Sequence, residues 1–357
     1  MNTRTPEHTN TTSQKGFYNQ YLKVFPLLAV VLLAVALLSI ILGAVQISFD
    51  DMYEALRKTF TGSEALTLDQ NIFIQLRLPR VLLSIITGAA LACSGVLMQA
   101  LFRNPIVEPG LVGTSSGAAF GAALYFVLGA TFKFNAGEWT LPIAAFIGGL
   151  ASTWLVYVLS YQKQQAGIVT LLLTGIAINA LFFSGVGFMA YLARDPQARS
   201  ITFWNLGTLS GANWHSVIIC LIVVSLSVFY SWRKGAALNT LMLGENEAAA
   251  LGVNVQRLKR NILLLNVLMV AVTTAFTGVI SFVGLIVPHL LRFWRGSDNR
   301  FLLLGSCLLG PILLTSADLT ARLLLAPAEL PIGIVTSVVG VPVFLFMMRK
   351  QFQYLKS

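Results

Sequence analysis

The chain has 357 residues, of which 56% are hydrophobic and only 11% are charged. A soluble domain carries roughly 25% charged residues, so this composition excludes an ordinary soluble protein. The net charge is +10. A basic excess indicates nucleic-acid binding only where it forms a patch, whereas in a membrane protein it reports orientation in the bilayer. The three cysteines lie inside apolar runs and are expected to pack as small hydrophobic residues.

Long stretches without charged residues divide the chain into candidate spans, since a helix needs about 20 apolar residues to cross a bilayer. The runs that lack Asp, Glu, Lys and Arg are 24–49, 81–102, 109–132, 139–162, 164–193, 200–232, 261–291, 301–317 and 330–348. They are continuously apolar and rich in Leu, Ala and Gly, which favours helices over strands. The sequence therefore predicts an all-α polytopic membrane protein with one transmembrane domain over 23–350. Polar cytoplasmic tails are expected at 1–22 and 351–357.

The first run is too long for the apolar part of a cleaved signal peptide, so it is expected to be the first spanning helix. The run 261–291 is harder to interpret, because its 31 residues would make a helix of roughly 46 Å across a core of about 30 Å. A single helix gives nine spans with the termini on opposite sides. A break near Thr277 and Gly278 gives ten spans with both termini on one side.

The distribution of basic residues discriminates between these two topologies, because cytoplasmic loops carry the excess of Lys and Arg. With ten spans and the N-terminus inside, 16 of the 24 basic residues lie inside, against 11 with nine spans. The sequence therefore predicts ten transmembrane helices with both termini cytoplasmic.

The sequence lacks the residues that several kinds of catalysis and of ion-coupled transport need. The phosphate-binding pattern GxxxxGK[ST] and the metalloprotease pattern HExxH have no match, and no pair of carboxylates lies inside a run. The chain is therefore expected not to be an enzyme, and to hold no catalytic group, cofactor or metal of its own. A secondary transporter, the alternative from another class, usually needs ionisable groups within the membrane. Their scarcity here indicates that energy enters from another protein.

Four segments carry more information than the rest. The segment QLRLPR places Arg77 and Arg80 on the outer side, against the charge trend, where they could simply anchor a helix at the interface. The segment 88–124 contains an inner loop followed by a tandem GxxxG, expected to place Gly113, Gly117 and Gly121 on one helix face for close packing. The third segment, 241–252, is expected to form a short inner helix that stops at Gly252 and that could be an ordinary connector. The fourth is a set of motifs between residues 278 and 335.

Taken together, these segments resemble the permease family of binding-protein-dependent ABC importers for cobalamin, ferric siderophores and haem, over about Arg77 to Phe346. The motifs that carry the resemblance, in order, are RLPR, GxxMQxxFRNPxxEPGxxGxSSGA, LGENEAAxLG, GLIVPHxxR and ADxxARxxxxxxELPIG. The resemblance implies a homodimer with an axial pathway, two copies of a separate ATPase that bind ATP and Mg, and a periplasmic or extracellular substrate-binding protein. It also implies a multi-pass protein of a prokaryotic inner (plasma) membrane.

The resemblance also implies roles for particular residues. Those expected to dock the binding protein are Arg77, Arg80 and Arg322. Those expected to form the coupling helix in a groove of the ATPase are Leu243, Gly244, Glu245, Asn246, Glu247, Ala248, Ala249, Leu251 and Gly252. Those expected to form a cytoplasmic gate are Asn104, Pro105 and Ile106.

The cargo is inferred from the outer part of the fifth run, which looks most like haem-uptake members. Arg194 and Arg199 could pair with propionates, while Phe182, Phe183 and Met189 offer apolar surface along the pathway. Ferric siderophores are often anionic too, so the same residues suit them. Haem is the first expectation, followed by a ferric siderophore and then by cobalamin.

Overall fold

The computed structural model describes residues 11–354, except for 44–46, 63–64, 133–136 and 163–164. Its helices and strands, in chain order, are α1 (Thr11–Ile41), α2 (Phe49–Thr61), α3 (Leu68–Ile72), the π-helical turn η1 (Phe73–Arg77), α4 (Leu78–Phe102), the 3₁₀ turn η2 (Pro109–Val112), α5 (Thr114–Thr131), α6 (Thr140–Ser160), β1 (Tyr161–Gln162), β2 (Gln165–Ala166), α7 (Ile168–Leu192), α8 (Asp195–Asn205), α9 (Trp214–Arg233), α10 (Gly235–Leu243), α11 (Glu245–Ala250), α12 (Val255–Thr277), α13 (Val283–Arg295), α14 (Asn299–Leu324) and α15 (Ile332–Tyr354). The two strands form one short antiparallel pair.

The prediction of an all-α polytopic membrane protein is confirmed. Within the described residues, eight helical segments are long and apolar enough to cross a membrane, and 114–129 and 283–294 form shorter apolar helices. The predicted break in the long run is present, because α12 ends at Thr277 and Gly278 follows with φ +69°. At 1.5 Å per residue α13 is only about 20 Å long, so it is shorter than a full span.

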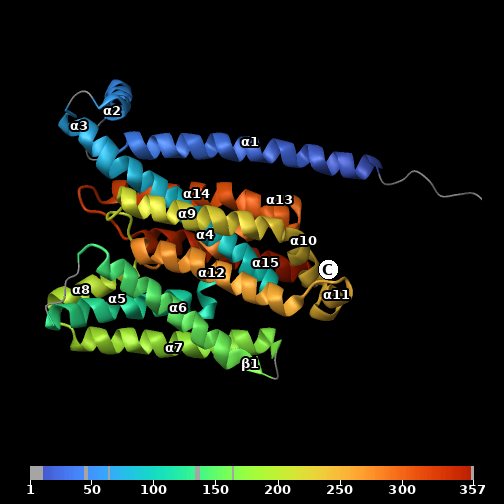
Figure 1. Cartoon of the computed structure of the whole chain (residues 1–357). Helices are drawn as coiled ribbons and strands as arrows, with labels where there is room; N and C mark the ends of the chain where they lie inside the picture. Colours follow the sequence, from blue (N-terminus) through green and yellow to red (C-terminus); the bar gives the residue numbers. More distant parts are fainter. Residues whose placement is uncertain (1–10, 44–46, 63–64, 133–136, 163–164, 355–357) are drawn as a thin grey trace, which may run out of the picture.

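The two ends of the described chain lie on the same side of the bundle, as Figure 1 shows for the start of α1 and the end of α15. This arrangement requires an even number of crossings, which agrees with the predicted parity. The count of ten stays a prediction, because α5 and α13 are short. The end that carries α10 and α11 is called the inner end below, and the opposite end the outer end, following the charge distribution.

The predicted polar tails differ in part from the observed helices. α1 begins at Thr11, within the tail expected over 1–22, and residues 1–10 lie outside the described residues. α15 continues to Tyr354, within the tail expected over 351–357, of which residues 355–357 are not described. The limits of the transmembrane domain and the cytoplasmic placement of the tails therefore remain predictions.

α4 forms the centre of the bundle and packs against α9, α12, α13 and α14. Two glycines allow its backbone to approach these neighbours closely. A Cβ atom on Gly88 would lie 2.6 Å from the Gly310 carbonyl oxygen of α14, and one on Gly95 would lie 1.8 Å from the Gly284 oxygen of α13. Since neither position has room for a side chain, these glycines set the spacing of the core helices.

The tandem GxxxG acts in the predicted way at two of its three positions. Gly117 and Gly121 of α5 face the carbonyl oxygens of Gly148 and Ala144 on α6, where a Cβ atom would lie 2.3 and 2.2 Å away. Gly113 is not on the helix as expected. It precedes α5 with φ +88°, where it ends the 3₁₀ turn and allows the chain to change direction.

Candidate functional site

The three arginines predicted to dock a binding protein lie together at the outer end. Arg80 is held by two carboxylates: its Nη2 lies 2.9 Å from Asp318 Oδ1, and its Nη1 lies 2.9 Å from Glu329 Oε1. Arg322 also binds Asp318, with Nε 3.1 Å from Oδ2. Asp318 is fully buried and Glu329 is 41% exposed. We call these residues and Arg77 the outer arginine cluster.

The outer arginine cluster also donates hydrogen bonds to the C-terminal end of α1. Arg77 Nη1 donates to the carbonyl oxygens of Ile40 and Ile41 at 2.5 and 2.9 Å. Arg322 Nη2 donates to the carbonyl oxygen of Ser39 at 2.9 Å. The last carbonyls of a helix have no partner within it, so these guanidinium groups supply the missing donors. The arginines are therefore anchored inside the protein, and a cavity of about 420 Å³ opens beside them.

Arg77 and Arg80 lie within a helix and not before one, contrary to the expectation that the second span starts after them. The helical segment runs without interruption from Leu68 through η1 to Phe102. Burying arginines in a helix is costly unless their charge and donors are matched, and the partners on α1 and α14 provide that match. These partners are distant in sequence, which is why the pattern of charges alone did not place the helix start.

The predicted gate is a tight turn at the inner end, directly after α4. Arg103 adopts φ +51°, and the Asn104 N–H donates to the Gln99 carbonyl oxygen at 3.1 Å. The Asn104 side-chain oxygen accepts the Ile106 N–H at 3.0 Å, which is the usual way an asparagine closes a turn. Pro105 borders an inner cavity and Ile106 is partly exposed. The turn thus returns the chain into the bundle.

Beyond this turn, the loop is tied to the break between α12 and α13. Glu108 Oε1 accepts the Phe282 N–H at 2.9 Å, and the Asn266 side chain donates to the Pro109 carbonyl oxygen at 3.4 Å. Phe282 has φ +69°, a strained conformation for a residue other than glycine, and the carboxylate satisfies its amide. The loop is therefore hydrogen-bonded both to α12 and to the residue that precedes α13.

Sequence reasoning missed Glu108 and Asn266 as functional candidates. Glu108 lies in the expected inner loop, and the scarcity of ionisable groups in the spans gives no information about amides. The available signal was Asn266 in the middle of a long apolar run, because a polar group there needs a partner. Gln99 gives the same signal in α4, where it accepts from Arg292 and donates to the Gly284 oxygen at 3.3 Å.

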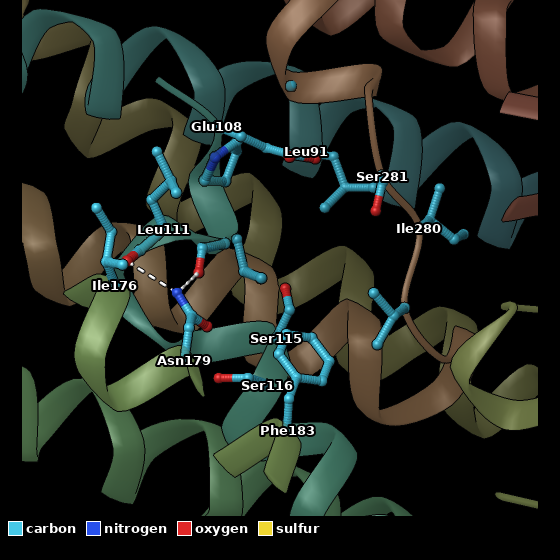
Figure 2. Close-up of a pocket in the computed structure, with 15 residues that line it drawn as sticks. Leu91, Glu108, Leu111, Ser115, Ser116, Ile176, Asn179, Phe183, Ile280 and Ser281 are labelled. Atoms are coloured by element: carbon cyan, nitrogen blue, oxygen red, sulfur yellow. Dashed lines mark hydrogen bonds between the residues drawn. The ribbon is translucent and has the colours of Figure 1, made fainter. Parts of the chain in front are cut away.

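The loop also forms one wall of a cavity of about 360 Å³ (Figure 2). The cavity is bounded by α7, by the start of α5 and by the segment between α12 and α13. Asn179 of α7 donates to the carbonyl oxygens of Gly110 and Leu111 at 3.2 and 3.1 Å, so α7 is tied to the loop. Figure 2 shows Ser115, Ser116 and Phe183 around the same space. The cavity therefore combines apolar walls with hydroxyl and amide groups.

The residues predicted to line the pathway separate into three groups. Phe183 lines this cavity. Phe182 packs edge-on against Phe120 of α5, and Met189 is buried in the core formed by α5, α7 and α8. Arg194 and Arg199 are exposed at the outer end, at and within α8. Phe182 also borders a separate cavity of about 630 Å³ beside α5 and α6, whereas Met189 lies in the core.

The predicted coupling segment is a short helix at the inner end. α11 covers Glu245–Ala250, and Gly252 ends it with φ +83°, as expected for a glycine stop. Ala248 is buried, whereas Asn246, Glu247, Ala249 and the flanking Leu243 and Leu251 are exposed. Glu245 Oε2 lies 2.5 Å from Lys259 Nζ of α12, whose side chain is almost fully buried. The segment thus exposes small and apolar residues while being fixed to α12.

The described residues contain no group of three or more His, Cys, Asp or Glu side chains that could hold a metal ion. The three cysteines carry free thiols, and the Sγ atoms of Cys93 and Cys307 lie 3.4 Å apart where α4 meets α14.

Comparison with known proteins identifies the family. The FecCD transport family matches residues 31–350. The chain is 39% identical over 324 residues to the hemin transport system permease protein HmuU of Yersinia pestis, covering 91% of this chain and 94% of that protein. It is 38% identical over 282 residues to the vitamin B12 import system permease protein BtuC of Vibrio cholerae serotype O1, covering 79% and 84%. The chain belongs to the FecCD transport family.

A solved structure agrees with this assignment. A metal-chelate type ABC transporter in an inward-facing conformation superposes with a TM-score of 0.80 at 31% identity, over 92% of this chain and 99% of that one. The chain is therefore a permease of an ABC importer and a multi-pass inner-membrane protein.

Proposed function

We propose that this chain, paired with a second copy of itself, forms the pathway of an importer for haem. The likeness to the hemin permease carries the proposal, because it has higher identity and coverage than the likeness to the vitamin B12 permease quoted above. The exposed Arg194 and Arg199 at the outer end fit an anionic cargo, and Phe183 in the cavity fits an apolar one. A ferric siderophore is the second candidate and cobalamin the third.

Energy comes, in this proposal, from two copies of a separate ATPase that bind ATP and Mg, and cargo comes from a soluble binding protein. α12 joins the inner parts of the site, because Lys259 holds the coupling segment and Asn266 holds the loop after the gate. A displacement of α11 would therefore move α12 and the gate residues Asn104, Pro105 and Ile106 together.

The cargo is tested in vesicles that contain the permease and its ATPase, with the binding protein loaded in turn with haem, a ferric siderophore or cobalamin. We expect haem to stimulate ATP hydrolysis and to enter the vesicles, because its propionates and its ring match the exposed arginines and the apolar wall. Stimulation by one of the other cargoes, with none by haem, would replace the first candidate with that cargo.

The docking role proposed for Arg77, Arg80 and Arg322 can be tested by removing a competing carboxylate. Glu329→Gln takes one negative charge from the exposed side of the outer arginine cluster, so an acidic partner should bind more tightly. Exposed ion pairs contribute roughly 0.2–1 kcal/mol, which corresponds to a gain of up to about five-fold in affinity. Binding is measured by surface plasmon resonance at low and high salt. Unchanged or weaker binding would indicate that the arginines only hold the helices together.

The coupling role proposed for residues 243–252 predicts a strong effect at Ala249. Ala249→Trp places a large side chain on the exposed face of α11, so the helix should no longer fit a groove of the ATPase. We expect at least about a thirty-fold loss of affinity for the ATPase, seen as loss of co-purification, since disrupting a hot spot of an interface costs about 2 kcal/mol or more. Ala249→Ser, which keeps a small side chain, is the control. Wild-type recovery with Ala249→Trp would place the ATPase contact elsewhere.

A further inference from the structure

α2 (Phe49–Thr61) carries an apolar surface that the fold leaves uncovered. One part of its apolar face is buried: Met52 and Ala55 pack in a core with Ile40 of α1 and Phe73 of η1. The next part is exposed, with Phe49 68%, Tyr53 70% and Leu56 39% accessible. These three residues are spaced i, i+4 and i+7, which places them on one side of a helix.

The next side of α2 is charged. At 3.6 residues per turn, Asp50 and Glu54 lie about 90° and about 130° around the helix axis from the exposed apolar residues, and Arg57 lies one turn after Tyr53 at the edge of this charged side. The helix thus has an apolar face and a polar face, with two aromatic residues on the uncovered part of the apolar face. Such a helix is stable at a boundary between water and an apolar medium.

The helix is built to stay in place. The Asp51 N–H donates to the Ser48 side-chain oxygen at 3.1 Å at its start, and Gly62 ends it with φ +63°. Gln70 of α3 donates to Glu54 at 3.3 Å. Because both ends are capped and one face is packed, the exposed aromatic residues are not the flexible tip of a loop.

The position of α2 indicates what covers it. In Figure 1 it lies to the side of α1, outside the outline of the other helices, at the level where α1 ends and α4 begins. α1 itself exposes Leu27, Val30 and Leu33 along its apolar span, as expected for a helix at the lipid boundary. The medium next to α2 is therefore the bilayer, near its outer surface.

We propose that α2 is an interfacial anchor, with Phe49, Tyr53 and Leu56 inserted among the outer-leaflet lipids. Tyrosine is enriched at this depth, because its ring is apolar and its hydroxyl stays hydrated. The anchor does not need anionic lipids, since α2 carries three acidic and two basic residues and the adjacent span already holds it at the membrane. It fixes the segment between α1 and the outer arginine cluster relative to the bilayer.

The test measures where spin labels on α2 lie in vesicles of phosphatidylethanolamine and phosphatidylglycerol. Single cysteines for the label are introduced as Phe49→Cys and Tyr53→Cys on the apolar face, with Asp50→Cys and Glu54→Cys as matched controls on the polar face. The background variant has Cys93, Cys220 and Cys307 replaced by alanine, and its ATPase stimulation is compared with the unaltered protein. Collisions with oxygen report lipid, and collisions with a water-soluble nickel chelate report water.

We expect labels at 49 and 53 to favour oxygen and labels at 50 and 54 to favour the nickel chelate. Labels at 49 and 53 that collide with nickel as often as the controls would overturn the proposal, because the face would then lie in water. Labels at 49 and 53 shielded from both reagents would overturn it too, because a second copy or another protein would then cover the face. Replacing phosphatidylglycerol with a neutral lipid should leave the pattern unchanged.

Discussion

Asp318→Asn is expected to destabilise the protein strongly, by about 3–5 kcal/mol, because it leaves two arginines without their shared buried carboxylate. Asp318 is fully buried and binds both Arg80 and Arg322, and Arg322 in turn holds the end of α1 through Ser39. Loss of the charge should therefore loosen the contact between α1 and α14 as well as the ion pairs. Thermal unfolding in detergent, followed by the loss of monodisperse protein on size exclusion, measures the effect.

Glu329→Gln is the matched control for this variant. Glu329 binds the same guanidinium of Arg80, but it is 41% exposed. Water can therefore replace most of the stabilisation that the ion pair gives to the arginine. The loss should be within about 1 kcal/mol. Equal destabilisation by the two variants would contradict the view that Asp318 is the centre of the outer arginine cluster.

Gly95→Ala is expected to prevent normal packing of α13 on α4, because the added Cβ atom would lie 1.8 Å from the Gly284 carbonyl oxygen. Backbone atoms cannot move aside as a flexible side chain can. Overpacking in a close-packed core costs roughly 1–3 kcal/mol and occasionally more, and a clash between two backbones lies at the upper end. We expect a low yield of folded protein. The protein that does fold should lose stimulated ATP hydrolysis, because α13 also contacts Pro109 in the loop after the gate.

Gly187→Ala provides the comparison. Gly187 lies within α7 and has no atom within 4 Å of an added Cβ, so the change should be neutral or stabilising by about 0.5–1 kcal/mol. Wild-type thermal stability of Gly95→Ala, measured beside this variant, would show that α4 and α13 do not approach as closely as described.

Much of the architecture could be predicted from the sequence. Runs without charge identified most spans, because a charged side chain is expensive in a bilayer and few positions tolerate one. The break at Gly278 was predictable because a single helix over 261–291 would be longer than the bilayer is thick and because a break puts more of the basic residues inside. The stop at Gly252 followed from the conformational freedom of glycine. Each of these inferences depends only on neighbours along the chain.

The site was harder to predict, since its groups interact across long sequence separations. Arg80 meets Asp318 over 238 residues and Glu108 meets Phe282 over 174. Periodicity carries no information about such pairs. Phe182 and Met189 show the same limit, because an apolar residue on a spanning helix can face lipid, a cavity or another helix. Only the packing placed Met189 in the core and Phe182 against Phe120 at the edge of a second cavity.

The sequence by itself determined the class of protein, the parity of its crossings, the close-packing glycines at 117 and 121, and the short inner helix. These follow from local physics: the cost of charge in lipid, the length of a helix and the space beside a glycine. Only the tertiary structure decided that the outer arginines are held by carboxylates and by the end of α1. It likewise decided that the loop after the gate is hydrogen-bonded to α12 and that α2 leaves an apolar face uncovered. These properties depend on which distant side chains are brought into contact.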